Sequence, residues 1–331
     1  MEFRKLGNSD LEISAITFGA WAAGGWMWGG TESSDAINAI HEAYNLGVTS
    51  IDTAPIYGQG TSEEIVGEAI KDIPRDKVQI LTKFGLSWEG TNGEFYFKSK
   101  KNDGKPIDVY YYASKERVIK ECEDSLKRLR TDYIDLYQIH WPDPTTSIQE
   151  TMEAVDELIK DGKVRYAGVC NYSVEQMSEA DKFVNIVSNQ VHYSMVQRKI
   201  EKDLVPHVIE NNKSILAYSP LGRGLLTGKI YPGYNFSEGD HRKGVFYFSD
   251  ENIKRTNIFL DKIKSLADEK NATLAQLVLR WTIEQPGITI ALAGARNGEQ
   301  SIQNANAINI RLDESEIKFL TDELNKLELV K

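Results

Sequence analysis

The sequence predicts an α/β protein: a single closed (β/α)8 barrel (a TIM barrel) with an N-terminal β-hairpin and extra helices at the C-terminus. Two observations lead to this prediction. Short β-branched or aliphatic runs alternate with amphipathic helical runs along all 331 residues, with no linker and no internal repeat. After the opening hairpin there are eight runs of the first kind, which is the number of strands that closes such a barrel. We therefore expect one domain over residues 1–331.

The expected elements follow one another in a regular order. The hairpin comprises residues 3–6 and 11–13 around a turn at Gly7 and Asn8. The helical stretches have apolar residues at three- and four-residue spacing and Ser or Thr near their starts, and they are 33–46, 62–70, 114–129 and 148–160. The candidate barrel strands are 15–19, 49–52, 79–83, 134–140, 165–170, 186–192, 215–219 and 289–293.

Two long segments depart from this alternation. Residues 85–112 are aromatic and rich in Lys and Gly, and residues 222–250 are rich in Gly, Tyr and Phe. Both follow strands, and loops of this length in a compact domain are usually functional. Because barrel enzymes build their active sites at the C-terminal ends of the strands, we expect both segments to be active-site loops.

Composition excludes several classes of protein. No apolar run approaches the roughly 20 residues of a membrane span, and the N-terminus has no apolar core of a signal peptide. The only cysteines, Cys122 and Cys170, are far apart, so we expect no disulfide framework, no metal site and a cytoplasmic location. A formal charge of −10 argues against a nucleic-acid partner. We expect a monomer or a weak oligomer that binds a small molecule.

Four polar residues lie at or just beyond the C-terminal ends of successive candidate strands. Asp52 ends the second strand, Tyr57 follows five residues later, Lys83 ends the third strand and His140 ends the fourth. Parallel strand ends meet at one rim of a barrel, so we expect the four side chains to converge. Each alone has an ordinary explanation, such as a helix cap for Asp52 or a packing role for Tyr57. Together they favour a catalytic site.

These residue types suit the reduction of a carbonyl group. A hydride that reaches the carbonyl carbon leaves negative charge on the oxygen, which must take up a proton. The phenol of Tyr57 can donate it, although its unperturbed pKa is about 10. The ammonium of Lys83 stabilises the phenolate and lowers that pKa, and Asp52 holds the ammonium in place. The imidazole of His140 can hydrogen-bond the same oxygen, orient the substrate or relay the proton.

Four stretches resemble a known family. They are DTAPIYG at 52–58, LTK at 81–83, SLKRL at 125–129 with YIDLYQIHWP at 133–142, and GKVRYAGVCNYS at 162–173. In order and spacing the chain resembles the aldo-keto reductase superfamily from residue 6 to residue 304, above all its bacterial general-stress and sugar-pathway members. The resemblance implies an NADP(H)-dependent oxidoreductase that interconverts small or sugar aldehydes and alcohols. It places Asp52, Tyr57, Lys83 and His140 at the catalytic tetrad positions.

The resemblance also implies a nicotinamide site. Family members hold the carboxamide with a Ser-Asn pair and a Gln, and the corresponding positions here are Cys170, Asn171 and Gln190. Cys170 is a departure, because a thiol is a weaker hydrogen-bond partner than a hydroxyl. Tyr218 matches the aromatic residue that stacks on the nicotinamide ring. The positions that resemble the pyrophosphate loop are Ser219, Leu221, Gly222, Arg223 and Gly224.

Residues 294–304 bear on the choice between NADPH and NADH. Many reductases carry Lys-Ser at Gly294 and the next position and Arg at Gln300, and this chain has neither. Arg296 remains, and its guanidinium can face the adenine or a 2′-phosphate, whereas Glu299 can pair with a ribose hydroxyl and favour NADH. We expect NADPH, with NADH as the alternative. The last two positions implied are Asn304, against the adenine, and Gln303, in place of a more usual acid.

Most of the six tryptophans fall in segments expected at the rim. Core packing explains part of this set, and the alternative is an aromatic-walled pocket for a sugar ring or a small aromatic aldehyde. The tryptophans concerned are Trp21, Trp26, Trp28, Trp88 and Trp141.

A second class of function stays open at this point. It is a redox-sensing or interaction protein on the same barrel with little turnover, as the potassium-channel β-subunits illustrate within the superfamily. The complete set of four polar residues favours the enzyme, because a binding module needs no proton donor.

Overall fold

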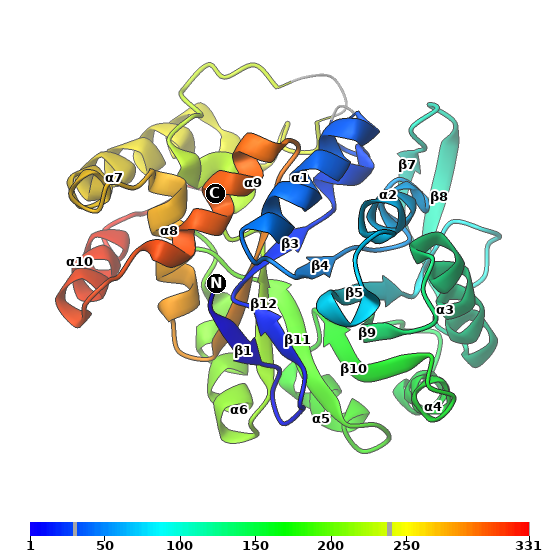
Figure 1. The fold of residues 1–331 in the computed structure, drawn as a ribbon. Helices are drawn as coiled ribbons and strands as arrows, with labels where there is room; N and C mark the ends of the chain where they lie inside the picture. The colour runs from blue at the N-terminus through cyan, green and yellow to red at the C-terminus, as the bar shows by residue number, and fades with distance from the viewer. Residues whose placement is uncertain (29–31, 237–239, 331) are drawn as a thin grey trace.

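The computed structural model describes residues 1–28, 32–236 and 240–330. Eight parallel strands close into a barrel in the order β10-β11-β12-β13-β3-β4-β5-β9, which confirms the predicted fold (Figure 1). The strands are β3 (Ile16–Gly19), β4 (Ser50–Asp52), β5 (Gln79–Phe84), β9 (Ile134–Ile139), β10 (Val164–Cys170), β11 (Ile186–His192), β12 (Ser214–Tyr218) and β13 (Ile288–Gly294).

Helices surround the barrel, and several begin at the caps that the sequence predicted. Ser114 accepts a hydrogen bond from the backbone N–H of Arg117, and Ser147 accepts one from that of Glu150. The helices are α1 (Ser33–Asn45), α2 (Thr61–Ile70), α3 (Lys115–Leu129), α4 (Ile148–Lys160), α5 (Val174–Ala180), α6 (Leu204–Glu210), α7 (Asp250–Glu269), α8 (Leu274–Glu284), α9 (Gly298–Ala305) and α10 (Glu314–Leu324). None of those described is long and apolar enough to cross a bilayer.

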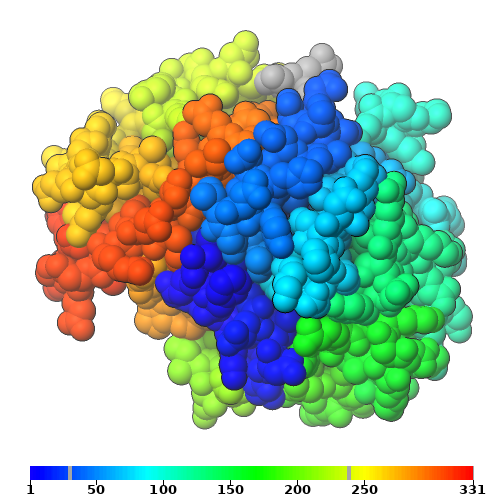
Figure 2. Space-filling model, in the orientation of Figure 1, coloured from blue at the N-terminus to red at the C-terminus, as the bar shows by residue number. Residues whose placement is uncertain are grey.

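The hairpin of β1 (Phe3–Lys5) and β2 (Glu12–Ser14) covers the N-terminal ends of the barrel strands. It is anchored there by the backbone N–H of Gly7, which donates to the Ser214 hydroxyl at 2.7 Å. Leu6, Leu11 and Ile13 pack against apolar side chains of the barrel interior. Figure 2 shows the hairpin in dark blue between the C-terminal helices and the green middle of the chain. One end of the barrel is thereby closed, and the opposite rim is left for the site.

The prediction that residues 85–112 form a loop is wrong. They form an antiparallel sheet in the order β6-β8-β7, from β6 (Leu86–Ser87), β7 (Glu94–Lys100) and β8 (Pro106–Tyr111). This sheet packs its aromatic side chains on Trp26 and Ile56 beside the rim. The second long segment has only the short helices η4 (Gly222–Thr227) and η5 (Phe246–Phe248), and its residues 237–239 lie outside the described part.

Candidate active site

Lys83 and Asp52 form a buried ion pair at the ends of the adjacent strands β5 and β4. The Nζ atom of Lys83 donates to Asp52 Oδ1 at 2.6 Å and to the carbonyl of Thr53 at 2.8 Å. Lys83 is 0% exposed and Asp52 is 3% exposed. Burial acts to lower the pKa of Lys83, but the Asp52 carboxylate, together with Tyr57 and Cys170, outweighs burial and holds that pKa above its usual value. Lys83 is therefore a permanent buried cation.

Tyr57 and His140 meet at the same rim. Lys83 Nζ lies 5.2 Å from the centre of the Tyr57 ring, and the His140 ring lies edge-on to Tyr57, with centroids 5.7 Å apart. Burial raises the pKa of Tyr57 to about 12, against the opposing effect of Lys83. We expected Lys83 to bring the pKa of Tyr57 below its usual value. This expectation is wrong, because burial raises that pKa by more than Lys83 lowers it. Burial and Lys83 also hold the pKa of His140 well below its usual range, so its ring is neutral at pH 7.

A network of amides holds the other oxygen of Asp52. Gln190 Nε2 donates to Asp52 Oδ2 at 2.7 Å, and the same group of Gln138 lies at 3.5 Å from that oxygen. The thiol of Cys170 points to Gln138 Oε1 at 3.9 Å, and so belongs to the same network. Sequence reasoning missed Gln138, although an amide inside an apolar strand was a signal. Asp52 is thus fixed from three neighbouring strands, which in turn fixes Lys83.

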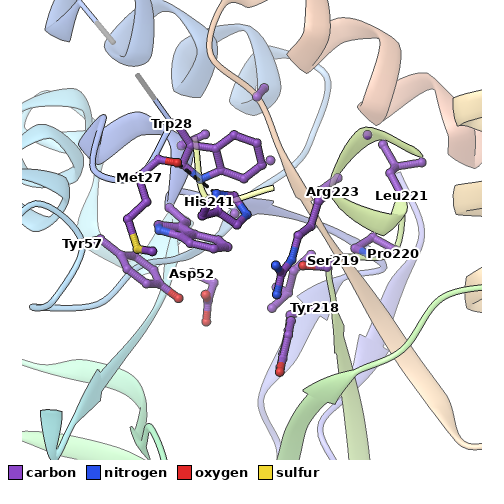
Figure 3. Close-up of a pocket in the computed structure, with 18 of the residues that line it drawn as sticks. Met27, Trp28, Asp52, Tyr57, Tyr218, Ser219, Pro220, Leu221, Arg223 and His241 are labelled. Atoms are coloured by element: carbon purple, nitrogen blue, oxygen red, sulfur yellow. Dashed lines mark hydrogen bonds between the residues drawn. The ribbon is translucent and has the colours of Figure 1, made fainter. Parts of the chain in front are cut away.

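Above this network lies a cavity of about 600 Å³. Figure 3 shows Tyr57, Met27, Trp28 and His241 on one side of it and Tyr218 and Arg223 on the other. Lys83 stays behind Asp52 and does not line the cavity, and neither does Gly222. The predicted site residues that line it are Asp52, Tyr57, His140, Cys170, Asn171, Gln190, Tyr218, Ser219, Leu221, Arg223, Gly224, Gly294, Arg296, Gln300, Gln303 and Asn304.

The residues predicted to hold the nicotinamide are linked to each other. Asn171 has a left-handed backbone with φ of 58°, donates to the carbonyl of His140 at 3.1 Å and accepts from the Tyr218 hydroxyl at 3.0 Å. Tyr218 in turn stacks on His192, with centroids 5.2 Å apart and planes 8° from parallel. His192 therefore holds one face of the Tyr218 ring and Asn171 holds its hydroxyl group. The other face of the ring is left for stacking on another ring.

Two arginines that line the cavity suit an anionic ligand. The guanidinium of Arg223 makes no hydrogen bond or ion pair within residues 1–28, 32–236 and 240–330, and its Nε atom is buried. Burial lowers the pKa of Arg223, because no carboxylate there offsets the loss of water. Arg296 is exposed at the far end of the cavity. Glu299 accepts from Gln303 at 3.3 Å and does not pair with Arg296 in the described structure.

The structure places four of the five tryptophans of the predicted aromatic wall at the cavity. Trp21, Trp26, Trp28 and Trp141 line the cavity, and Trp26 also donates from Nε1 to the carbonyl of Lys100 at 3.0 Å. Trp88 does not line it and packs instead against the apolar cluster that contains Leu86 and Val109. Its inclusion in the pocket was wrong, because it directly follows β6 and its ring joins this cluster.

The sequence reasoning missed His241, which lies in the second long segment. Its ring lies 4.9 Å from Trp21 and 4.7 Å from Trp28, and its Nδ1 is 2.9 Å from the carbonyl oxygen of Met27. Through His241, the second long segment therefore contacts the connection between β3 and α1. One of only five histidines in a loop expected at the rim was the available signal.

Comparison with known proteins agrees with this geometry. The model of the aldo/keto reductase family matches residues 15–325. This chain belongs to the aldo-keto reductase family. A second finding is the similarity to the aldo-keto reductase YhdN of Bacillus subtilis (strain 168), 39% identical over 302 residues that make up 91% of this chain and 86% of that protein. As a family member, this chain is an oxidoreductase that uses a nicotinamide cofactor.

Two further relatives have named activities. The NADH-specific methylglyoxal reductase of Escherichia coli (strain K12) is 34% identical over 328 residues, 98% of each chain. The glycerol dehydrogenase AKR11B4 from Gluconobacter oxydans has a solved structure that superposes with a TM-score of 0.88 at 36% identity, covering 98% of this reductase and 95% of that chain. The two named activities concern different substrates, and a coenzyme is named only for the Escherichia coli enzyme. The substrate and the coenzyme of this reductase must therefore be inferred from its own residues.

Proposed function

We propose that this reductase interconverts small aldehydes, including sugar aldehydes, with their alcohols in an NADP(H)-dependent reaction, as one barrel domain. The proposal rests above all on Tyr57. Its ring faces the cavity, Lys83 lies beneath it and His140 lies beside it. A protonated phenol in that position is suited to give a proton to the oxygen of a carbonyl group.

The residues around the cavity fit a nicotinamide dinucleotide. The buried, unpartnered Nε of Arg223 suits a pyrophosphate, and the free face of Tyr218 suits a planar nicotinamide ring. Asn171 and Gln190 line the space between that ring and Tyr57 and supply amide groups. When bound, the cofactor supplies or accepts the hydride.

The proton is handled by this chain's own residues. Tyr57 holds it on its hydroxyl at neutral pH, because burial raises its pKa to about 12. Once the proton leaves, the phenolate is stabilised by the adjacent Lys83 ammonium. The neutral His140 ring hydrogen-bonds the substrate oxygen and orients it. Asp52, held by Gln190, keeps Lys83 in position.

Purified protein is expected to oxidise NADPH when methylglyoxal or another reactive aldehyde is added. Reduction needs the protonated phenol and should change little between pH 6 and pH 9. Alcohol oxidation needs the phenolate, so its rate should rise with pH, by up to about tenfold per unit below the Tyr57 pKa. Initial rates in both directions across pH test this. NADPH binding without turnover of any aldehyde would instead favour the redox-sensing alternative.

The coenzyme preference is proposed to depend on Arg296. Its guanidinium has no hydrogen-bond or ion-pair partner among the described residues, and Glu299 accepts a hydrogen bond from Gln303, which together favour a 2′-phosphate over a ribose hydroxyl. Arg296→Ala should raise KM for NADPH about 10-fold to 100-fold, because one charge-assisted contact contributes about 1.5–3 kcal/mol. KM for NADH should change by less than about threefold.

Steady-state kinetics with both nucleotides measure this preference. Arg255→Ala, on the surface of α7, is the matched control and should leave both KM values as they are. Equal losses with NADPH and NADH in Arg296→Ala would contradict a 2′-phosphate contact.

A further inference from the structure

Three buried nitrogen atoms in the cavity wall beside Tyr57 lack a hydrogen-bond partner among the described residues. They are Nε1 of Trp21, Nε1 of Trp28 and Nε2 of His241. The three rings touch one another, with centroid distances of 4.7–5.4 Å, and all line the cavity. Leaving one buried polar atom unpaired costs about 1–3 kcal/mol. Three in one place indicate a position for a polar group of a ligand.

The proton on His241 is placed by its other nitrogen. Nδ1 lies 2.9 Å from the carbonyl oxygen of Met27, which only accepts, so Nδ1 carries the hydrogen. Burial lowers the pKa of His241, so the ring is neutral at pH 7 and Nε2 keeps its lone pair. The indole nitrogens of Trp21 and Trp28 can only donate. The Trp21–Trp28–His241 cluster therefore offers two donors and one acceptor.

This cluster contacts Tyr57 through Trp21. Trp21 stacks on Tyr57 with centroids 6.0 Å apart and planes 26° from parallel, and it contacts His241 on its other side. Figure 3 shows Trp28 and His241 on the side of the cavity that holds Tyr57, and Tyr218 and Arg223 on the other side. A substrate whose carbonyl reaches Tyr57 therefore has the cluster within the same cavity, next to its reacting end.

We propose that the cluster binds a hydroxyl group of the substrate, so that the enzyme selects hydroxyaldehydes and polyols over aldehydes that lack hydroxyl groups. A hydroxyl can accept from an indole N–H and donate to His241 Nε2 at the same time. A methyl group can do neither, and a second carbonyl can accept but cannot donate to His241. This inference rests on the proposed function and assigns the substrate class of the same site.

The test compares glyceraldehyde with propanal, which has the same three carbons and no hydroxyl. In the wild type, kcat/KM with NADPH, expressed per free aldehyde, should favour glyceraldehyde about 100-fold, because unsatisfied buried polar groups disfavour the analogue. His241→Phe keeps an aromatic ring but removes the acceptor, and should lower this preference about tenfold. Trp28→Phe removes one donor and should lower it in the same direction.

His207→Phe is the matched control, because it makes the same exchange on α6, outside the cavity lining. It should leave the preference unchanged. A wild-type preference near one, or a preference that survives both His241→Phe and Trp28→Phe, would overturn the hydroxyl site while leaving the reductase intact.

A binding measurement avoids turnover when it uses Tyr57→Phe, which is expected to bind the cofactor but not to oxidise alcohols. Quenching of tryptophan fluorescence in its NADP⁺ complex should show glycerol binding about tenfold more tightly than 1-propanol. Equal or weaker binding of glycerol overturns the inference. If the wild type reduces neither aldehyde, the proposed function fails, and the hydroxyl site is then decided by this binding measurement.

Discussion

Tyr57→Phe is expected to lower kcat for aldehyde reduction by about 10³-fold, within the 10²–10⁴-fold range that general acid catalysis contributes. The exchange removes only the hydroxyl group. The ring keeps its contacts with Trp21 and His140, and Lys83 keeps its bond to Asp52. The dissociation constant of NADPH should therefore stay within about twofold, measured by fluorescence titration alongside the kinetics.

A matched control distinguishes the loss of the proton donor from a general effect of removing a phenol hydroxyl group. Tyr133→Phe removes a phenol hydroxyl just before β9, at the closed end of the barrel, where the ring packs against the Arg75 guanidinium. Its kcat should equal that of the wild type. Most of the activity surviving in Tyr57→Phe would mean that another group supplies the proton.

Asp52→Ala is expected to reduce the free energy of unfolding by about 3–5 kcal/mol at pH 7. It leaves the Lys83 ammonium, which is 0% exposed, beside the carbonyl of Thr53 and the ring of Tyr57, without the carboxylate that balances its charge in the described structure. Breaking a buried ion pair at one partner costs this much because the other charge stays buried. Urea unfolding at pH 7 measures the loss.

The loss of unfolding free energy in Asp52→Ala should depend on pH, because the Lys83 ammonium is buried. In Asp52→Ala, burial without a carboxylate depresses the folded-state pKa of Lys83 below its unfolded value. The penalty is then fully present at pH values below the folded-state pKa and shrinks as the pH rises towards the unfolded value near 10. A loss that stayed constant from pH 7 to pH 10 would contradict an unpaired buried ammonium.

Two variants complete this test. The double variant Asp52→Leu with Lys83→Met replaces both charges with apolar groups and should recover most of the lost stability, yet remain inactive. Asp322→Ala breaks an exposed pair with Lys318 and should cost no more than about 1 kcal/mol. A single-variant loss as small as this control would mean that Lys83 is not a buried cation.

The alternation of apolar runs determined the barrel, and the polar residues at the strand ends determined which side chains meet. Both are local patterns, since strand ends of a parallel barrel must share a rim. Asp52, Tyr57, Lys83 and His140 could therefore be placed without coordinates. The cofactor positions needed the family resemblance, because Asn171 and Tyr218 carry no local signal that distinguishes them.

Tertiary structure alone decided three features of the site. The β6-β8-β7 sheet depends on pairing between distant residues, and it moved Trp88 out of the pocket. His241 reached the site because a long segment crosses the cavity, which no spacing in the sequence encodes. The pKa of Tyr57 was predicted from its charged neighbour, but burial by the whole rim outweighs that neighbour. Periodicity is a local property, whereas desolvation is the sum over everything that covers a group.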